Sequence, residues 1–319
     1  MRKGRTYRQV SQETGVPLEL LGGALEAIGF ARMGPDEPMR EDELEVVPLL
    51  QLGLSSGIFD LAWLTRVGRG YAEGLRLIAQ VEKELWQARL IAPLLASGVD
   101  QQTARDRASQ LSGDFDLPSL ADRVLLAAYR RHQELAWTED LVEDVEAALE
   151  AAGGLGRPER VPAMCFLDLV GYTRLTEERG DQAAARLAAS LADLVEQLSV
   201  PRGGQPVKWL GDGVMVHFRD PAGAVLAALQ MVEQLPQAGL PPAHVGVAAG
   251  PVVVQGGDYF GRTVNLAARI AAHASASRVL VSERVAERAP PQGVTFVELG
   301  QVPLQGIAHP VRLLEARRA

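Results

Sequence analysis

The sequence predicts two regions of different fold class: an all-helical region, followed by an α+β region whose sheet is covered by helices on one face. Before a glycine- and proline-rich stretch at residues 151–163, apolar residues recur at helical spacing in almost every segment. After that stretch, short apolar runs typical of strands alternate with amphipathic helical segments. The length of 319 residues also fits two domains of ordinary size.

The composition is that of a globular protein. Hydrophobic residues make up 47% and charged residues 23% of the chain. No apolar run approaches the roughly 20 residues that a membrane span needs, and the basic start "MRKGRTYRQV" is not followed by the apolar segment of a secretory signal. Cys165 is the single cysteine, so no internal disulfide can form. We therefore expect no membrane span and a cytoplasmic location.

Charge is unevenly divided between the two regions. Residues 1–155 carry 25 acidic and 16 basic residues, a balance of −9, and the remainder carries +1, which gives the total of −8. An acidic region is a poor electrostatic partner for a phosphate backbone. We therefore do not expect nucleic acid to be a partner of the first half.

The helical region is expected over residues 1–152, with a linker at 153–160. It opens with "TYRQVSQETGVPLELLGGALEAIGF", in which Gly15 separates two short helical patterns like a helix-turn-helix. Its last pattern, residues 119–150, reads as one long helix or two. A DNA-binding module or a small helical docking module would both fit the opening, and the acidic charge favours the docking module.

The α+β region is expected over residues 161–319. Helices are predicted at residues 173–198, 220–235 and 261–274. Strands are predicted at 163–170, 278–282, 294–300 and 311–316, a hairpin at 207–218, and two short strands within 244–257.

Two carboxylates lie where neighbouring strands can bring them together. Asp168 ends the first buried strand in "FLDLVGYT", and Asp212 sits in the Gly-Asp-Gly turn of the hairpin "VKWLGDGVMVHF". If the two strands are neighbours, their oxygens form a hard site suited to Mg²⁺ or Mn²⁺. The turn into the following helix offers backbone N–H groups to phosphate. Taken alone, an aspartate in a glycine turn more commonly just makes the turn.

A third segment, "GDYFGRTVNLAARI", adds polar groups to a mostly apolar helical pattern. Asn265 and Arg269 are four residues apart and so share one helix face, and Asp258 precedes them. For the helix alone, a structural hydrogen bond to the sheet is the plainer interpretation.

Taken together, the three segments resemble the class III nucleotidyl cyclases, the family of bacterial and animal adenylate and guanylate cyclases. That family carries F-x-D-[IL]-V-G-[FY]-T, V-K-x-[IL]-G-D and D-x-x-G-x-x-V-N-x-A-x-R in this order. The matching stretches here are "FLDLVGYT", "VKWLGD" and "DYFGRTVNLAAR". The resemblance covers about residues 160–316 and implies a ferredoxin-like, palm-type sheet.

The resemblance also implies a role for each matching residue. Asp168 and Asp212 match the metal-binding aspartates, with two Mg²⁺ or Mn²⁺ ions per site. Lys208 and Asp258 match the pair that contacts adenine, Asn265 the residue that orients the ribose, and Arg269 the arginine that stabilises charge on the α-phosphate. Guanine-selective relatives usually carry Glu and Cys or Ser at the Lys208 and Asp258 positions, so the implied reaction is ATP to cyclic AMP and pyrophosphate.

The family's sites lie between two catalytic domains. Lys208 and Asp212 are about 13 Å apart along an extended strand, too far for one tight cluster. In the family, one subunit supplies the metal carboxylates and the other supplies the adenine pair, Asn and Arg. A chain with all six positions is therefore expected to act as a homodimer.

The helical half resembles N-terminal domains of some soluble bacterial class III cyclases. Those domains regulate catalysis, and in some members they respond to pH or bind a fatty acid. The resemblance thus implies regulation by residues 1–152, with room for a small-molecule or lipid effector. His132 is the one histidine of that half and is more commonly a plain surface residue than a sensor. The rival functions are a DNA-binding regulator whose cyclase-like domain only senses nucleotide, and a guanylate cyclase.

Overall fold

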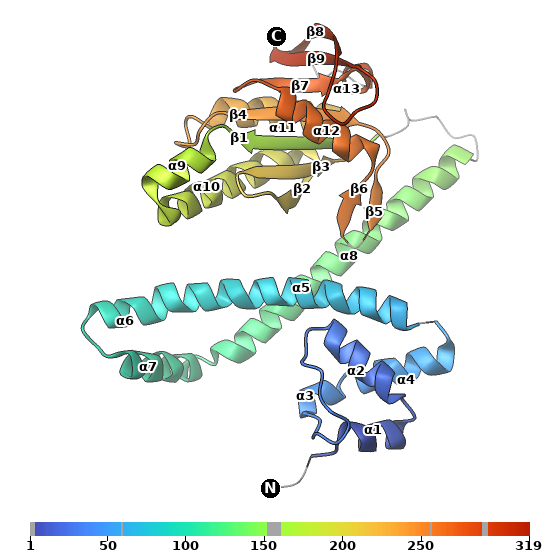
Figure 1. Cartoon of the computed structure of the whole chain (residues 1–319), viewed down its shortest axis with the longest axis vertical. Helices are drawn as coiled ribbons and strands as arrows, with labels where there is room; N and C mark the ends of the chain where they lie inside the picture. Colours follow the sequence, from blue (N-terminus) through green and yellow to red (C-terminus); the bar gives the residue numbers. More distant parts are fainter. Residues whose placement is uncertain (1–3, 59, 152–160, 256, 289–292) are drawn as a thin grey trace. The chain divides into compact units, whose positions relative to one another are not determined.

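The computed structural model describes residues 4–58, 60–151, 161–255, 257–288 and 293–319 (Figure 1). The chain separates into two compact units, residues 1–149 and 150–319. The linker expected at 153–160 lies outside the described residues. No helix in the described part of the chain is long and apolar enough to cross a membrane.

The first unit is all-helical over its described residues, apart from one isolated β-bridge between Thr6 and Pro38. Its helices are α1 (Tyr7–Thr14), α2 (Leu18–Ala27), α3 (Glu41–Leu44), α4 (Val47–Ser56), α5 (Leu61–Trp86), α6 (Ala92–Ala96), α7 (Gln101–Asp114) and α8 (Leu117–Ala151), with a π-helical turn at Gln87–Ile91. A small core formed mainly by α1, α2 and α4 includes Val10, Leu21, Leu25 and Leu50.

Local capping explains the helix pair at the start of this unit. The Thr6 hydroxyl accepts a hydrogen bond from the Gln9 backbone N–H at 3.3 Å, and the Gln9 side chain accepts one from the Thr6 N–H at 2.9 Å. Gly15, with φ of 74°, ends α1 in the left-handed region. The two helices expected around Gly15 are thus present.

Two long helices dominate the rest of the unit. The segment expected at 119–150 is one continuous helix, α8, and not two. Tyr71 of α5 and Tyr129 of α8 join them, with hydroxyl oxygens 2.8 Å apart and rings meeting edge to face at 6.1 Å. In Figure 1, α6 and α7 lie at the turn between α5 and α8.

The second unit is built on strands and helices in alternation. They are β1 (Ala163–Leu169), α9 (Tyr172–Arg179), α10 (Asp181–Ser199), β2 (Gly204–Trp209), β3 (Gly213–Phe218), α11 (Pro221–Gln234), β4 (Ala243–Ala249), β5 (Val253–Gln255), β6 (Asp258–Phe260), α12 (Arg262–His273), β7 (Val279–Ser282), α13 (Glu283–Glu287), β8 (Val294–Val302) and β9 (Val311–Arg318), with a 3₁₀ turn at Val200–Arg202.

The described strands form a seven-stranded sheet and a separate hairpin. The sheet order is β2-β3-β1-β4-β7-β9-β8, with only β4 and β7 parallel, and β5 pairs with β6 outside it. Strand β1 lies between β3 and β4, so the residue that ends it has neighbours on both sides. The predicted α+β class is confirmed.

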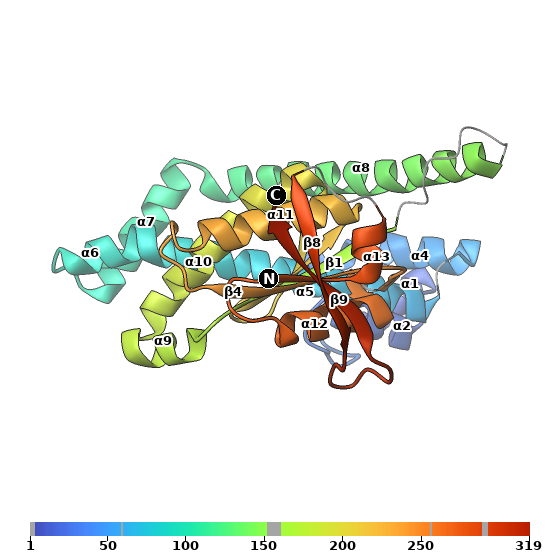
Figure 2. The ribbon, with the colours of Figure 1, turned by 90° about the horizontal axis from the view of Figure 1, so that it is seen from above.

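Helices cover both faces of this sheet, which differs from the expected single covered face. One core contains the odd-numbered residues of β1 together with α10 and α11, including Cys165, Leu191 and Val225. The other contains Met164 of β1 and Ile270 of α12. Seen from above in Figure 2, α10 and α11 lie on one side of the strands and α12 on the other. The apolar pattern of residues 261–274 predicted a helix but could not tell which face it covers.

The helix α12 lies unusually close to the sheet. A Cβ built on Gly246 of β4 would meet the backbone N of Ala271 at 2.1 Å and the backbone O of Ala267 at 2.5 Å. Only a glycine lets the two backbones approach this closely. This contact fixes where Asn265 and Arg269 stand above the sheet.

Candidate active site

The carboxylates Asp168 and Asp212 come from neighbouring strands, as predicted. In the antiparallel register of β1 and β3, Asp168 lies opposite Gly213, and the Leu169 N–H donates to the Asp212 carbonyl at 3.1 Å. Gly211, with φ of 80°, makes the turn that carries Asp212. A Cβ on Gly213 would meet an Asp168 carboxylate oxygen at 3.0 Å, so glycine leaves room for that side chain.

The negative charge of Asp168 affects Asp212. The pKa of Asp212 is raised above its ordinary value, chiefly by burial and also by the nearby negative charge of Asp168. Two carboxylates that repel each other are stabilised by a shared cation, and hard oxygen donors suit Mg²⁺ or Mn²⁺. The donor set therefore fits a divalent ion. Over the described residues, no three or more His, Cys, Asp and Glu side chains form a metal cluster, so phosphate and water would have to complete the coordination.

His244 is a site residue that the sequence interpretation missed. It is the second residue of β4 and lies opposite Asp168, and its Nε2 lies 3.3 Å from an Asp168 carboxylate oxygen. Its side chain is 23% exposed, whereas that of Asp168 is 50% exposed. The available signal was a polar residue near the start of an otherwise apolar strand, but only the pairing of β4 with β1 gives it a partner.

Lys208 and Asp258 form an ion pair, although they are 50 residues apart. The Lys208 Nζ donates to an Asp258 carboxylate oxygen at 2.6 Å, and the other oxygen accepts from the Tyr259 N–H at 2.9 Å. This pairing holds the pKa of Asp258 below its ordinary value. An ion pair this exposed stabilises a fold by about 1 kcal/mol at most. This small gain in stability does not explain why the chain places two opposite charges at this position.

Asn265 and Arg269 are both exposed on α12, and their side chains make no hydrogen bond or ion pair to another described residue. The plainer interpretation, a structural bond between helix and sheet, is therefore wrong. The guanidinium of Arg269 passes about 3.8 Å from where a Cβ would stand on Gly306, in the loop between β8 and β9. Two free polar groups on the exposed side of a packed helix are available to a ligand.

The predicted residues on strands share one face of the sheet. Side chains alternate along a strand, so Asp168 lies on the same face as Met164, which packs against α12. Lys208 lies opposite Met215, which belongs to the same core. The α12 face thus gathers Asp168, the ion pair and the two polar residues of the helix within one unit.

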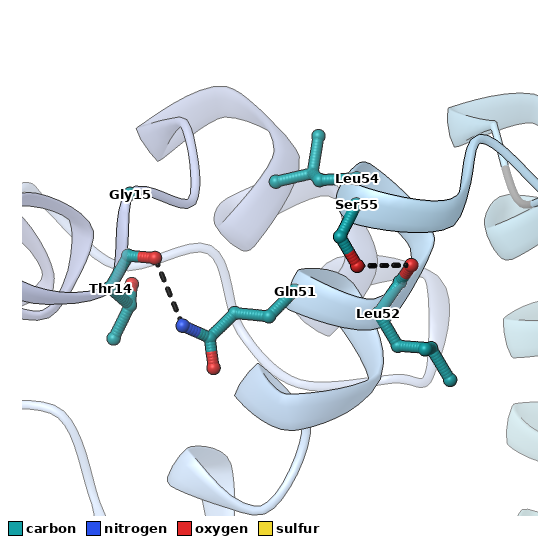
Figure 3. Close-up of a pocket in the computed structure, with 6 residues that line it drawn as sticks. All are labelled: Thr14, Gly15, Gln51, Leu52, Leu54 and Ser55. Carbon is teal, nitrogen blue, oxygen red and sulfur yellow. Dashed lines mark hydrogen bonds between the residues drawn. The ribbon is translucent and has the colours of Figure 1, made fainter.

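Two surface hollows lie elsewhere, in the helical unit. One of about 670 Å³ is lined by Thr14, Gly15, Gln51, Leu52, Leu54 and Ser55 (Figure 3). In it, the Gln51 amide donates to the Thr14 carbonyl at 3.0 Å. A second, of about 300 Å³, lies beside Leu20, Leu54 and Leu61. Neither contains a predicted catalytic residue, and the expected small-molecule or lipid effector stays a prediction.

Comparisons with known proteins show the family of the chain. The family profile for the adenylate and guanylate cyclase catalytic domain matches residues 157–314. The chain is 32% identical, over 98% of its own length and 77% of the relative's, to the pH-sensitive adenylate cyclase of Mycobacterium tuberculosis. It is 28% identical to an adenylate cyclase of Streptomyces coelicolor, over 88% of this chain and 70% of that one.

Among solved structures, the adenylyl cyclase CyaB from P. aeruginosa is 22% identical, with a TM-score of 0.45 over 50% of this chain and 94% of that one. The family profile and the M. tuberculosis relative show that the chain belongs to the adenylate and guanylate cyclase family. It is a cyclase enzyme, and the named relatives reported above are adenylate cyclases.

Proposed function

We propose that this enzyme is an adenylate cyclase that converts ATP to 3′,5′-cyclic AMP and pyrophosphate. The observation that carries the proposal is the Lys208–Asp258 ion pair, 2.6 Å long, on the same sheet face as the carboxylates of β1 and the β2–β3 turn. In the reaction, the ribose 3′-oxygen forms a bond to the α-phosphorus. The bond from that phosphorus to the bridging oxygen breaks, pyrophosphate leaves, and the 3′-hydroxyl proton passes to water.

The ion pair supports adenine as the base. Lys208 can donate to N1 and Asp258 can accept from the 6-amino group, and guanine presents the opposite pattern at those two positions. Both side chains are accessible, at 52% and 28% exposure. Guanylate cyclase activity is therefore the weaker candidate.

The carboxylates support a divalent metal. Asp168 and Asp212 would hold two Mg²⁺ or Mn²⁺ ions, which when bound lower the pKa of the 3′-hydroxyl and neutralise the triphosphate. His244 holds Asp168 from the neighbouring strand. The negative charge that Asp168 and Asp212 share is what repels a triphosphate in the absence of such ions.

The two polar residues of α12 complete the chemistry. Asn265 would orient the ribose, and Arg269 would offer its planar fork of donors to the α-phosphoryl oxygens as charge develops there. Neither has a competing partner among the described residues. Positioning and charge stabilisation of this kind supply most of the acceleration in phosphoryl transfer.

The exposed apolar side chains of this unit support a homodimer with shared sites. Large apolar residues stand exposed on the β2–β3 turn and on the β5–β6 hairpin beside the ion pair, namely Trp209, Leu210, Val253, Val254 and Phe260. A contiguous apolar surface around polar groups is typical of an interface. A second copy covering it would bring its own Asp168 and Asp212 toward this copy's Arg269.

Product identification tests the activity. The full-length chain is incubated with ATP or GTP and Mn²⁺, and the product is separated by chromatography against authentic cyclic nucleotides. We expect cyclic AMP and pyrophosphate from ATP, and at least tenfold less cyclic GMP, because one mispaired charged hydrogen bond costs about 1.5–3 kcal/mol. Comparable cyclic GMP would reject adenine selectivity, and no cyclic product would reject the proposal.

Mixing two inactive variants tests the shared site. Asp168→Ala and Arg269→Ala chains should each be inactive, whereas a refolded mixture should regain activity because each heterodimer contains one intact site. Two variants of the same carboxylate pair, Asp168→Ala with Asp212→Ala, are the matched control and should give no recovery. Failure of the first mixture to recover would exclude a site built across two chains.

We also propose that the helical unit regulates catalysis and does not bind DNA. Helix α2, which would face the groove in a helix-turn-helix, carries Glu19 and Glu26 and no basic residue. His132 is exposed on α8, as a plain surface residue would be. The regulatory role rests on the match of the M. tuberculosis relative over 98% of this chain, which includes the helical unit.

A further inference from the structure

We propose that the stacked pair His217–Tyr259 positions Asp258 against Lys208 and thereby sets the enzyme's choice of nucleotide base. The inference rests on the proposed adenylate cyclase function and names two residues that never touch the base. Its starting point is that Asp258 does not belong to the main sheet. It begins β6, in the two-stranded β5–β6 hairpin that stands apart from the seven strands.

The stack is the aromatic contact between this hairpin and the sheet. The rings of His217 and Tyr259 have centroids 4.6 Å apart and planes inclined by 25°. His217 is on β3, opposite Met164 of β1, so its side chain lies on the α12 face. Tyr259 is part-buried against the core on that face and follows Asp258 directly in the chain.

The base of the hairpin is fixed separately. The Thr263 hydroxyl of α12 donates to the Pro251 carbonyl at 2.8 Å, where the chain leaves β4 for β5. Gly261, with φ of 125°, then turns the chain from β6 into α12. These contacts hold the two ends of the hairpin. They do not determine how the hairpin is oriented over β2 and β3, which depends on contacts along β6.

The ion pair alone is too weak to fix that direction. Lys208 is a flexible side chain, and exposed ion pairs contribute little to ordering. The stack buries apolar ring area and adds a favourable ring geometry, and both partners are stiff side chains. It therefore orders β6, and this also fixes the position of Asp258, which directly precedes Tyr259 in the chain.

Loss of the stack should affect recognition of the base more than the chemical step. With β6 free to move, Asp258 no longer meets Lys208 in one geometry, and the pair no longer discriminates the 6-amino group from a carbonyl. The carboxylates on β1 and the β2–β3 turn and the polar residues of α12 are held by other contacts. The expected signature is a raised KM for ATP with a kcat close to that of the parent enzyme.

The experiment measures steady-state kinetics with ATP and with GTP for the full-length enzyme and its variants. Tyr259→Leu and His217→Ala should raise the KM for ATP by about fivefold or more, lower the ATP:GTP preference by a similar factor, and change kcat less than about threefold. Binding of a fluorescent ATP analogue should weaken in parallel. Tyr259→Phe and His217→Phe keep two rings in contact, so their KM for ATP and their ATP:GTP preference should equal those of the parent enzyme. Gln182→Ala, at an exposed position of α10 on the other face of the sheet, is the matched control and should have no effect.

Each outcome decides the inference separately from the proposed function. If the parent enzyme makes cyclic AMP selectively and Tyr259→Leu retains both KM and preference, the inference is overturned and the function stands. If Tyr259→Phe behaves like Tyr259→Leu, the hydroxyl and not the stack matters, and the inference also fails. Equal losses of kcat and kcat/KM with a lowered melting temperature would show a purely structural role and would overturn it too. If the parent enzyme shows no preference between ATP and GTP, the proposed adenine selectivity is rejected before the variants are considered.

Discussion

At the scale of single residues, the site places charges where they cost stability. Asp212 is part-buried beside Asp168, and both effects raise its pKa. A carboxyl group whose pKa is higher in the folded than in the unfolded protein binds its proton more tightly when folded. Its ionised form therefore destabilises the metal-free fold above the unfolded pKa, and this penalty is relieved as the pH falls through the folded pKa.

The first prediction follows from that sign. Asp212→Asn should abolish cyclase activity and leave the metal-free protein at neutral pH as stable as the parent or more stable, because the repelled charge is gone. Thermal melts without metal, followed by melts with Mn²⁺, check this. Mn²⁺ should stabilise the parent but not the variant. If the variant without metal has a lower melting temperature than the parent, the ionised Asp212 side chain does not destabilise the metal-free fold.

His244 gives a second prediction. Removing the neighbour that holds Asp168 at 3.3 Å should weaken metal use, since loss of such an outer partner typically costs about 10–100-fold in metal affinity or activity. His244→Ala should raise the Mn²⁺ concentration for half-maximal activity by about tenfold. His244→Gln, which can still donate to Asp168, should recover part of the loss. An unchanged metal requirement in both variants would show that the contact has no role at the site.

At the scale of elements, the closeness of α12 to β4 decides where the catalytic side chains stand. The sequence predicted this helix and its shared Asn265–Arg269 face. It could not predict that Gly246 is the point of closest approach, because the contact joins residues far apart in the chain.

The third prediction tests that contact. Gly246→Ala should destabilise the fold by about 1–3 kcal/mol or more, because its Cβ would overlap the backbone of α12 at Ala271. It should also lower kcat, because any shift of α12 moves Arg269. Gly74→Ala is the matched control: it lies inside α5 with nothing within 4 Å of the added Cβ, and it should stabilise by up to about 1 kcal/mol. Urea unfolding of both variants makes the comparison, and equal effects would contradict the packing argument.

The β5–β6 hairpin shows the same limit of sequence interpretation. The two short strands expected at residues 244–257 correspond to β4 and β5, whereas β6 and its pairing with β5 outside the main sheet were not predicted. Without the tertiary structure, Tyr259 is one more aromatic residue in a motif, and His217 is one more residue of a strand. Their stacking at 4.6 Å appears only once β3 and β6 are placed in space.

At the scale of the whole molecule, two units with separate cores raise the question of what the helical one does. The first unit has its own apolar core, and the second has two, one on each face of its sheet. A domain with its own core can fold and act alone. Regulation can therefore be tested by comparing the activity of the catalytic unit alone with that of the full chain.

The fourth prediction concerns that dissection. A protein of residues 156–319 should retain cyclase activity and differ from the full chain in the height or the pH dependence of that activity, because the helical unit no longer biases the catalytic one. Activity is measured from pH 5.5 to 8.5 at equal protein concentration and at several dilutions, so that dimer dissociation is separated from regulation. Superimposable profiles would remove the proposed regulatory role.

The sequence by itself determined the two fold classes and the family, and it predicted the metal and base residues, because local patterns and motif spacing carry that information. Asp168, Lys208 and Arg269 were all found this way. The tertiary structure alone decided which face α12 covers, that Lys208 meets Asp258, and that His244 holds Asp168. It also decided that the side chains of Asn265 and Arg269 have no partner among the residues it describes. Each of these is a contact between residues distant in the chain, and a linear pattern does not encode which distant neighbour a side chain will meet.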